Sequence, residues 1–484
     1  MGQQNEPERE SQVKAIKRLA YENGITAFSD NENMCYFLIE EGGNRLIIPD
    51  GRDIEDRLMV LYENQYGEPP NMNMLRSAIV SMCARARVNG DRVNLHVRIG
   101  HQDGAIYYDL CNPDYQAVRI TGQKVRLVKC NVKCRFCRDP NALAQCNPDL
   151  STSSKELIPL LEKHFHFVDQ CTMLFAAYLV GCFFPGIRQP ALVLHGEFGS
   201  AKTTAARLTK SLVDPNKIDV LSSFPDLRDL AVILQGSVYV VFDNLNRLTK
   251  KQSDELCSLI TGGQQAYREL YTNRGLAVLK PRASIALTGI DLPLSANDAL
   301  DRTIALKLAA IAPEKRKGDA QVQADFMRDK PRIMGAIFNA LSAVVRCQET
   351  LKPDRSARMA DSYRVELAAA MAIGIGREEF ENAYHLNMRR TAVVAGNHGE
   401  LFQKVLSLAE KAGRWEGNAT QLVSALRYDH DSYAPSTLSK DLKSLKTSLR
   451  EFGVHVNTNQ YTHNERKIVI ASTPTHDMKQ RTLK

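Results

Sequence analysis

The segment Leu192–Thr204, LVLHGEFGSAKTT, most strongly limits what this chain can fold into. A short apolar run ends at Gly196, a loop containing Gly199 follows, and the apolar-periodic run AARLTKSLV comes directly after Thr204. This order predicts a strand, a loop and a helix. A glycine-containing loop that leads into a helix N-terminus presents backbone N–H groups to an anion, so the segment predicts a phosphate-binding site.

The same segment resembles the Walker A phosphate-binding loop, G-x-x-x-x-G-K-[ST], with one departure. Ala201 stands where the second glycine is usual, which restricts the backbone conformation there. Lys202 is placed to reach the β- and γ-phosphates of ATP, and Thr203 offers a hydroxyl to Mg²⁺. The alternative is a chance turn containing glycine and lysine. The predicted nucleotide-binding residues are Gly196, Glu197, Phe198, Gly199, Ser200, Ala201, Lys202, Thr203 and Thr204.

Length and composition limit the class of protein. A chain of 484 residues predicts three or four domains, each large enough for its own core. The longest apolar runs are too short to span a bilayer, and the polar N-terminus does not resemble a secretory signal. Eleven cysteines in a chain of this length do not indicate a disulfide scaffold, so we expect a reducing cytoplasm. The net charge of +8 permits an anionic partner without requiring one.

We predict a disordered lead over residues 1–12 and an α+β N-terminal domain over residues 13–150. The EEGGN and DG turn signals, each between apolar runs, predict strand pairs. The expected elements of this domain are helices over residues 13–24, 57–65 and 73–88, and strand pairs over residues 34–49 and 94–110.

Four cysteines of this domain are candidate metal ligands. Cys130, Cys134, Cys137 and Cys146 have the spacing C-x3-C-x2-C-x8-C inside the basic segment KVRLVKCNVKCRFCRDP. Four soft ligands on short loops could hold a tetrahedral Zn²⁺. Two alternatives stay open: reduced thiols near a hairpin, and a basic segment that contacts phosphate.

A second motif lies about forty residues after the first, where VYVVFDNL predicts a buried strand that ends in an acid. It resembles a Walker B strand, in which Asp243 would hold Mg²⁺. The next position usually carries an acid that orients the attacking water, and here it is Asn244. An amide can position water without accepting its proton, and phosphoryl transfer depends mainly on positioning and electrostatics. A nearby acid such as Asp254 is the other candidate for assistance.

Three further polar residues follow in order. RELYT and LAVLK flank an NRG turn, which predicts a hairpin with Arg274 at its tip, either solvated or in contact with DNA. SIALTGI predicts a buried strand that ends near Thr288, and Arg302 precedes another strand-like run.

The motifs GEFGSAKTT, VVFDNL, TGGQQAYRELYT and ALDRTI, in this order, resemble the AAA+ ATPase core of superfamily 3 and minichromosome-maintenance-type helicases, most closely those of phages, plasmids and integrated mobile elements. The resemblance covers residues 155–395 well. It implies a ring, usually hexameric, that hydrolyses ATP between subunits and moves along DNA in the cytoplasm of a bacterial or phage-infected cell. It also implies that Thr288 occupies the sensor-1 position, that Arg302 is an arginine finger acting on the neighbouring subunit's nucleotide, and that Arg274 contacts DNA in a central channel.

The core is expected over residues 151–315, after a linker and helix cap in STSS, and a helical lid over residues 316–397. Runs at residues 331–346 and 366–377 have helical periodicity. Arg358 is the candidate sensor-2 arginine of the lid, with Arg355 and Arg364 as alternatives. A solvated charge at a helix start is the other interpretation of each.

Residues 398–473 resemble a winged-helix domain, followed by a tail over residues 474–484. Helices are expected at residues 400–412 and 420–426 with a break at residues 415–417 between them, then a third helix from residue 434 and a hairpin. The third helix is capped by Ser436 and places four leucines on one face, opposite a basic face suited to a DNA groove. A structural or protein-binding winged helix is the alternative. The leucines are Leu438, Leu442, Leu445 and Leu449; the predicted DNA-binding residues are Lys440, Lys443 and Lys446, with Arg466 and Lys467 in the wing.

The sequence therefore predicts an α/β P-loop ATPase with an α+β N-terminal domain, a helical lid and a winged helix. The leading hypothesis is a DNA helicase-like motor for replication or excision of a mobile element. The second is a nucleotide-gated loader, regulator or defence ATPase without unwinding activity, which Ala201, Asn244 and Thr288 favour because each departs from a standard catalytic feature. The third places priming in the N-terminal domain with the cysteines as a zinc module.

Overall fold

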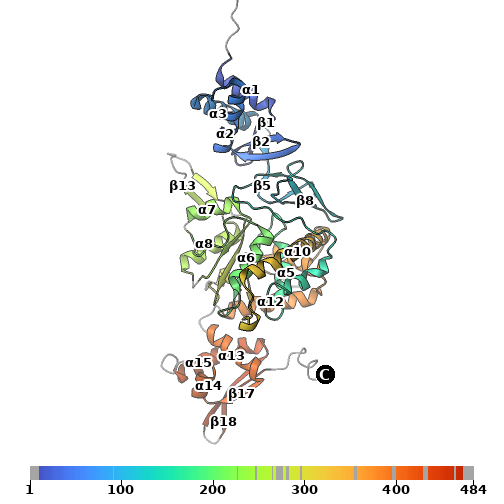
Figure 1. The fold of residues 1–484 in the computed structure, drawn as a ribbon. Helices are drawn as coiled ribbons and strands as arrows, with labels where there is room; N and C mark the ends of the chain where they lie inside the picture. The colour runs from blue at the N-terminus through green and yellow to red at the C-terminus, as the bar shows by residue number, and fades with distance from the viewer. Residues whose placement is uncertain are drawn as a thin grey trace, which may run out of the picture. The chain divides into compact units, whose positions relative to one another are not determined.

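A computed structural model gives the fold as a mixed α/β chain with several separate sheets (Figure 1). It divides into two compact units: residues 1–245, 258–290 and 306–383 form the first, and residues 246–257, 291–305 and 384–484 the second. The structure describes residues 10–90, 92–225, 227–245, 248–263, 265–268, 276–279, 283–294, 297–353, 357–394, 399–428, 434–462 and 465–472.

The first unit begins with three helices packed with a sheet of order β3-β2-β1-β4. The hairpin of β2 and β3 turns at Gly42 and Gly43, both with positive φ, as the EEGGN signal predicts. Cys35 and Cys83 form a disulfide between β2 and α3, which departs from the expectation of reduced cysteines. The elements are α1 (Gln12–Glu22), β1 (Ile25–Asp30), β2 (Cys35–Glu41), β3 (Asn44–Pro49), α2 (Arg52–Tyr66), α3 (Met72–Asn89) and β4 (Arg92–Val93).

A second, antiparallel sheet follows with the order β6-β7-β8-β9, which we call the middle sheet. Its first turn is Asp103–Gly104, where both residues have positive φ, as a type I′ hairpin turn requires. Every residue of β7 is buried, so this strand anchors the sheet. The strands are β6 (Ile99–Gln102), β7 (Ala105–Asp109), β8 (Gln116–Ile120) and β9 (Val125–Lys129), beside the short parallel pair β5 (Leu95–His96) and β10 (Arg135–Phe136).

The central sheet has the order β12-β15-β11-β16, and β15 runs parallel to both β11 and β12. These strands are continuous apolar runs because parallel sheets are covered on both faces. Parallel strands bring their carboxyl ends to one edge, where loops can form a site. The strands are β11 (Ala191–His195), β12 (Tyr239–Phe242), β15 (Ser284–Gly289) and β16 (Thr303–Lys307), and α6 (Lys202–Val213) follows β11.

The remaining elements between α6 and α10 include a hairpin of β13 and β14 at the predicted place, and Arg268, the one described residue of RELYT, belongs to β13. Residues 269–275, including Arg274, lie outside the described residues. The elements are α7 (Leu227–Gly236), α8 (Lys250–Thr261), β13 (Gln265–Arg268), β14 (Leu276–Leu279), α9 (Asn297–Leu300) and the short 3₁₀ helix η2 (Pro313–Lys315).

Helices α4, α10 and α11 pack against α5 (Figure 1). Every residue of α5 after the first is buried. Ser153 and Glu156 form the capping box of the short 3₁₀ helix η1 (Ser154–Glu156), as the STSS signal predicts. The helix expected from Pro331 begins twelve residues earlier, at Asp319, and the Pro331 carbonyl accepts a hydrogen bond from the Asp149 N–H at 2.8 Å. The helices are α4 (Leu157–Glu162), α5 (Cys171–Gly181), α10 (Asp319–Cys347) and α11 (Ala360–Ala372), with α12 (Arg377–Val394) beginning at the end of this unit.

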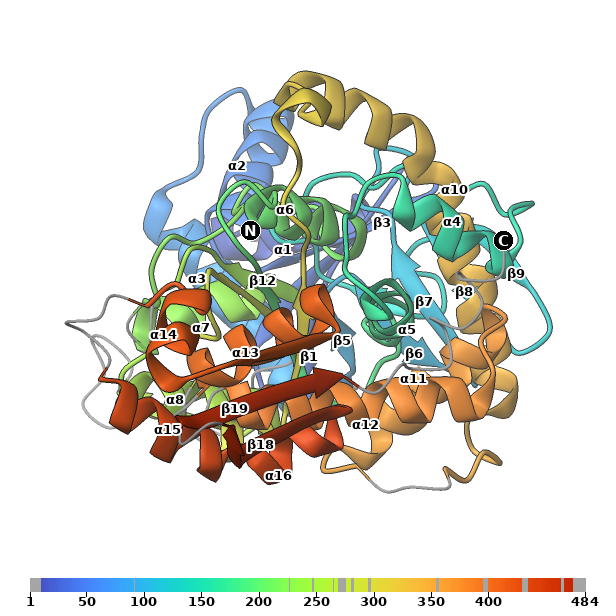
Figure 2. The same ribbon diagram turned by 90° about the horizontal axis from the view of Figure 1, so that it is seen from below.

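The C-terminal module of the second unit combines helices with a three-stranded antiparallel sheet of order β17-β19-β18 (Figure 2). The break expected at residues 415–417 does separate α13 from α14, and it is itself part of β17. The expected single third helix instead ends at Ser444, and a separate helix begins at Lys446. The N-cap of the third helix is Ala434 rather than Ser436. The elements are α13 (Gly399–Ala412), β17 (Arg414–Gly417), α14 (Ala419–Ala425), α15 (Pro435–Ser444), α16 (Lys446–Glu451), β18 (Val454–Thr462) and β19 (Glu465–Ser472).

The four predicted core leucines of this module, Leu438, Leu442, Leu445 and Leu449, are all buried. Their spacing was therefore sufficient to identify the buried face even though the helix is interrupted. Among the described residues, no helix is both long enough and apolar enough to cross a bilayer.

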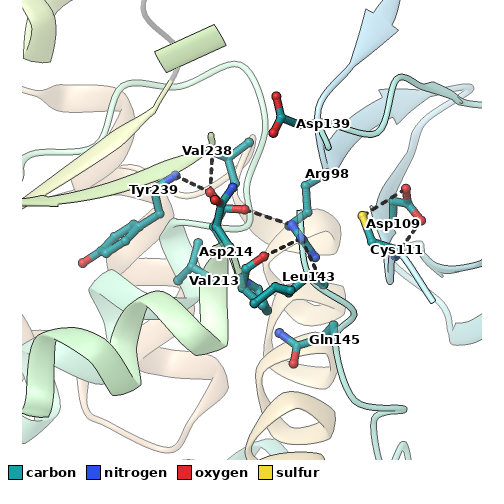
Figure 3. A network of polar contacts seen from close by, with 12 residues as sticks. Arg98, Asp109, Cys111, Asp139, Leu143, Gln145, Val213, Asp214, Val238 and Tyr239 are labelled. Carbon is teal, nitrogen blue, oxygen red and sulfur yellow. Dashed lines mark hydrogen bonds and ion pairs between the residues drawn. The ribbon is translucent and has the colours of Figure 1, made fainter. Parts of the chain in front are cut away.

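A buried ion pair joins the middle sheet to the end of α6 (Figure 3). Arg98 Nε lies 3.0 Å from Asp214 Oδ1, and both side chains are 1% exposed. The other carboxylate oxygen of Asp214 accepts hydrogen bonds from the Val238 and Tyr239 N–H groups at 3.0 and 3.3 Å. Asp214 therefore connects α6, the start of β12 and the segment before β6.

Side chains from the middle sheet and the segment after it also satisfy the last carbonyls of α6. The Tyr108 hydroxyl donates to Val213 O at 3.1 Å, and Gln145 Nε2 donates to the Ser211 and Leu212 carbonyls at 3.1 and 2.8 Å. Helix-terminal carbonyls lack intrahelical partners, and burying them without such donors is costly. This end of α6 is consequently fixed to the sheet.

We expect the Asp214→Asn variant to lose about 3–5 kcal/mol of unfolding free energy, because it leaves the Arg98 charge buried without its partner. The matched control is Asp219→Asn, which breaks the exposed pair of Asp219 with Arg207 of α6 and should cost at most about 1 kcal/mol. Denaturant unfolding of both variants measures the difference. Equal losses would show that the buried pair does not fix α6.

Candidate functional site

The glycine loop, defined as residues 196–201, connects β11 to α6 and has an unusual backbone. Gly199 has a φ of 77° and Ala201 a φ of 55°, both in the left-handed region. A Cβ on Gly196 would lie 2.6 Å from the Leu308 carbonyl oxygen, so a side chain does not fit there. Glycine therefore stands at the positions where the backbone requires it, whereas the left-handed backbone at Ala201 is strained and costs free energy.

The N–H groups of this loop are available to an anion. Among the described residues, none accepts a hydrogen bond from the backbone N–H groups of residues 197–201. The first N–H groups of α6 also lack intrahelical acceptors, and the helix dipole adds partial positive charge at that end. An oxyanion is the ligand that this arrangement favours.

Lys202 is held against the glycine loop. Its Nζ donates to the Gly196 and Glu197 carbonyls at 2.8 and 3.0 Å. Partial burial lowers the pKa of Lys202, and the nearby carboxylate of Asp243 works in the opposite direction. The ammonium thus lies beside the N–H groups of the loop and adds to the positive potential there.

Asp243 is the centre of a hydroxyl–carboxylate cluster drawn from three elements. Thr203 Oγ1, in the first turn of α6, donates to the Asp243 carboxylate with distances of 2.9 and 3.1 Å to its two oxygens. Thr288 Oγ1, at the end of β15, donates to Asp243 Oδ1 at 2.5 Å. The Asn244 N–H donates to Thr288 Oγ1 at 2.8 Å, so the Thr288 hydroxyl is used as both donor and acceptor.

The backbone on the other side of Asp243 is fixed as well. The Asp243 N–H donates to Leu221 O at 2.7 Å, and the Leu221 N–H donates to Val241 O at 2.9 Å. The sequence did not indicate Leu221, because its apolar side chain forms no hydrogen bond and only its backbone N–H and carbonyl bond to the Asp243 strand. The carboxylate is therefore positioned by its own strand, by α6 and by β15.

Asn244 has a left-handed backbone with φ 55°, and its side chain is exposed. Asparagine tolerates this region better than a glutamate does, because its short side chain can bond locally. The departure from an acid at this position therefore has a conformational reason that the sequence did not reveal.

Thr203 and Asp243 together offer a hydroxyl and a carboxylate, which are the hard oxygen donors that Mg²⁺ prefers. A carboxylate already oriented by two hydroxyl donors and a backbone network needs little reorganisation to bind a cation. The residues present consequently fit a magnesium–phosphate ligand.

The other predicted catalytic residues have their own local settings. Arg302 is half-buried, and its Nη1 donates to Cys257 Sγ at 3.0 Å. Arg358 is exposed and precedes α11 by two residues instead of beginning the helix. In the glycine loop, Ser200 is buried and donates to Glu197 O at 2.8 Å, whereas Phe198 is 82% exposed.

The structure does not bring the four candidate zinc ligands into one cluster. Within the described residues, no group of three or more His, Cys, Asp or Glu side chains is arranged to hold a metal ion. Cys130 and Cys134 are buried in the core of the middle sheet, and burial raises the pKa of Cys134 to about 12 and that of Cys137 to about 11. Burial also raises the pKa of Cys146. The spacing that suggested zinc is compatible with buried neutral thiols.

The predicted DNA-binding lysines Lys440, Lys443 and Lys446 are exposed on α15 and α16. Lys467 of β19 pairs with Glu416 of β17 at 3.1 Å. Arg466 is part of β19, and its side chain lies outside the described residues. The helical basic face is therefore available, while one of the two wing cations is already paired.

Two family models match the chain. Residues 159–385 match the model of the actinomycete integrative conjugative element replication protein, and residues 401–481 match the model of the RepA C-terminal domain of the same elements. No curated protein matches.

Among solved structures, three of the NrS-1 C-terminal region align over 96% of this chain and 100% of their own. One A-form apo structure has 10% identity and a TM-score of 0.38, and the other has 12% and 0.40. A further apo structure has 12% identity and a TM-score of 0.39.

We expect Ala201→Gly to raise the unfolding free energy by up to about 1 kcal/mol. The left-handed backbone costs a residue with a Cβ about 1–2 kcal/mol, and glycine removes that strain. Part of the gain is lost because glycine makes the unfolded chain more flexible. The matched control is Ala324→Gly at an exposed position of α10, which should lose about 1 kcal/mol. Denaturant unfolding would show opposite signs. Losses of the same sign and size would mean that Ala201 is not left-handed in solution.

Proposed function

We propose that this chain is an ATP-hydrolysing, helicase-like DNA motor of an actinomycete integrative conjugative element. The proposal is supported by the match of residues 159–385 and 401–481 to family models of replication proteins of such elements. The single observation that carries the proposal is the Asp243 cluster. The cluster lies at the N-terminus of α6, the helix into which the glycine loop leads. A cation-binding carboxylate beside a row of unused N–H donors suits a nucleoside triphosphate.

In this proposal ATP is the substrate. The N–H groups of the glycine loop and Lys202 would bind its phosphates. Thr203 and Asp243 would hold Mg²⁺, which when bound would supply neutralisation of the charge that develops on the phosphoryl group. Thr288 keeps the Asp243 carboxylate oriented through its hydroxyl. The exposed Asn244 amide orients the attacking water, and Arg302 of a neighbouring subunit supplies positive charge to the transition state.

The proposed architecture is a P-loop AAA+ core with a helical lid and a winged helix, assembled as a ring that is most simply a hexamer. The supporting features are the parallel order β12-β15-β11, the helices α10 and α11 that follow the core, and the C-terminal module. Exposed Lys440, Lys443 and Lys446 are the proposed DNA contacts, since lysines on one helix face suit phosphates in a groove.

A nucleotide-gated loader or regulator that binds ATP and DNA without unwinding is the second candidate. The observation that favours it is the absence of an acid at position 244, because an amide cannot accept a proton from the attacking water. The two candidates differ in turnover: a motor couples hydrolysis to DNA, whereas a gate binds ATP and turns over slowly.

We expect Thr288→Val to lower kcat for ATP hydrolysis by about tenfold or more, because valine keeps the shape but removes the hydroxyl that bonds Asp243 and the Asn244 N–H. Thr288→Ser keeps the hydroxyl and is the matched control, with turnover close to the wild-type value. Steady-state hydrolysis at saturating Mg²⁺ measures both. A Val variant as active as the Ser variant would remove Thr288 from the mechanism.

The proposed function is tested by ATP hydrolysis of the purified full chain with and without single-stranded DNA. We expect DNA to raise turnover, and we expect Lys202→Ala and Arg302→Ala each to lose it by about a hundredfold or more, since both remove transition-state charge stabilisation. A mixture of the two inactive variants should regain part of the activity if the arginine acts on a neighbour's site.

The outcome that would contradict the motor is ATP binding with turnover at the level of Lys202→Ala whether or not DNA is present. That result would favour the nucleotide-gated loader. A wild-type chain that binds no ATP would reject both candidates.

A further inference from the structure

We propose that Arg316 binds a phosphate group of the ATP held by the glycine loop of its own chain, an inference that rests on the proposed nucleotide site. Arg316 directly follows η2 and lies against the glycine loop at Gly199, which we call the crest of the loop. A Cβ built on Gly199 would be 2.6 Å from Arg316 Nη2 and 3.3 Å from its Cζ. The guanidinium therefore lies next to the Gly199 backbone, and no side chain separates it from the glycine loop.

Residues 308–316, which we call the strap, are fastened to the loop by backbone hydrogen bonds. The Leu308 N–H donates to His195 O at 2.8 Å, just before the glycine loop begins. The Ile311 N–H donates to Gly199 O at 3.1 Å, at the crest itself. The strap therefore follows the glycine loop, and a side chain at its end keeps a constant position relative to the N–H donors.

Arg316 is oriented at both ends of its side chain. Its backbone N–H donates to Pro313 O at 3.3 Å, and its Nε donates to Ile311 O at 3.1 Å. The acceptor Ile311 is the residue that bonds Gly199, so the guanidinium is positioned through the same link that holds the strap to the loop. This arrangement pre-organises the guanidinium, which reduces the entropy lost when it binds a ligand.

The terminal nitrogens of Arg316 have no acceptor among the described residues, and no described carboxylate forms an ion pair with it. The adjacent Lys317 differs, because it pairs with Asp325 at 2.8 Å. An exposed guanidinium with a fixed plane and unused Nη1 and Nη2 donors is suited to a phosphate oxygen pair. Arg316 and Lys202 would then approach the phosphates as two separate cations.

Gly199 has a second role in this arrangement. Its left-handed φ of 77° already favours glycine, and the close approach of Arg316 Nη2 adds an independent steric reason. Any side chain at this position would displace the guanidinium from the loop. The absence of a side chain at the crest is therefore a condition for Arg316 to reach the phosphates.

The test is the dissociation constant of ATP with Mg²⁺ for the full chain and four variants: Arg316→Ala, Arg316→Lys, Lys315→Ala and Lys202→Ala. We expect Arg316→Ala to weaken binding by about tenfold or more, since a charge-assisted hydrogen bond to phosphate is lost. Lys315→Ala removes the same charge from the same turn and should bind as the wild type does. Arg316→Lys keeps the charge without the planar donor pair and should fall between the two.

A structural role is separated from phosphate binding by the thermal midpoint without nucleotide. We expect this midpoint to be unchanged in Arg316→Ala. If the midpoint falls in Arg316→Ala, the Arg316→Lys variant decides between the two roles. A wild-type midpoint with weakened ATP binding in Arg316→Lys supports the proposal. A wild-type midpoint together with wild-type ATP binding overturns it.

Arg316→Ala binding equal to that of Lys315→Ala also overturns the inference, and the proposed function then stands as long as the wild type binds ATP and Lys202→Ala does not. Failure of the wild type to bind ATP rejects the proposed function itself, and the inference with it.

Discussion

The buried ion pair between Arg98 and Asp214 determines how α6 is held. Asp214 is the residue directly after α6, and its carboxylate is shared among Arg98, Lys210 and the backbone at the start of β12. Because isolated buried charges are costly, neither partner can move without the other. The other end of α6 carries the glycine loop, so the donors for an anion lie on a helix that the middle sheet fixes at its far end.

The Asp243 cluster follows from the order of the central sheet. β15 lies between β11 and β12, and its register pairs Leu287 with Phe242 and Thr288 with Leu194. Thr288 is therefore the first β15 residue beyond the end of β12, which places its hydroxyl beside Asp243. The same edge receives the start of α6 and hence Thr203. Three side chains far apart in sequence meet because two parallel strands end, and α6 begins, at the same edge of the sheet.

The sequence predicted the elements whose signals are local and missed those that depend on distant partners. The glycine loop, the EEGGN hairpin and the leucine face of α15 and α16 follow from spacing and turn chemistry. The strand β17 was missed because RWEG is short and polar and becomes a strand only by pairing with β19. The Arg98–Asp214 pair joins residues 116 positions apart, and no local pattern encodes it. The cysteine spacing alone does not separate the alternatives, because buried thiols give the same spacing as a ligand set.

The departures from the expected motifs have different physical meanings once their backbones are known. Ala201 and Asn244 both have left-handed φ, which alanine adopts at a cost and asparagine adopts readily. Asn244 therefore suits its backbone, so the amide alone is weak evidence for lost catalysis, and a glutamate introduced there would test strain as well as chemistry. Thr288 uses its hydroxyl fully, as donor to Asp243 and acceptor from the Asn244 N–H. Of the three departures that favoured a non-hydrolysing gate, only Ala201 keeps a cost that the surrounding structure does not offset. For the proposed ATPase, this geometry suits an Asn244 amide that positions the attacking water without a carboxylate at residue 244.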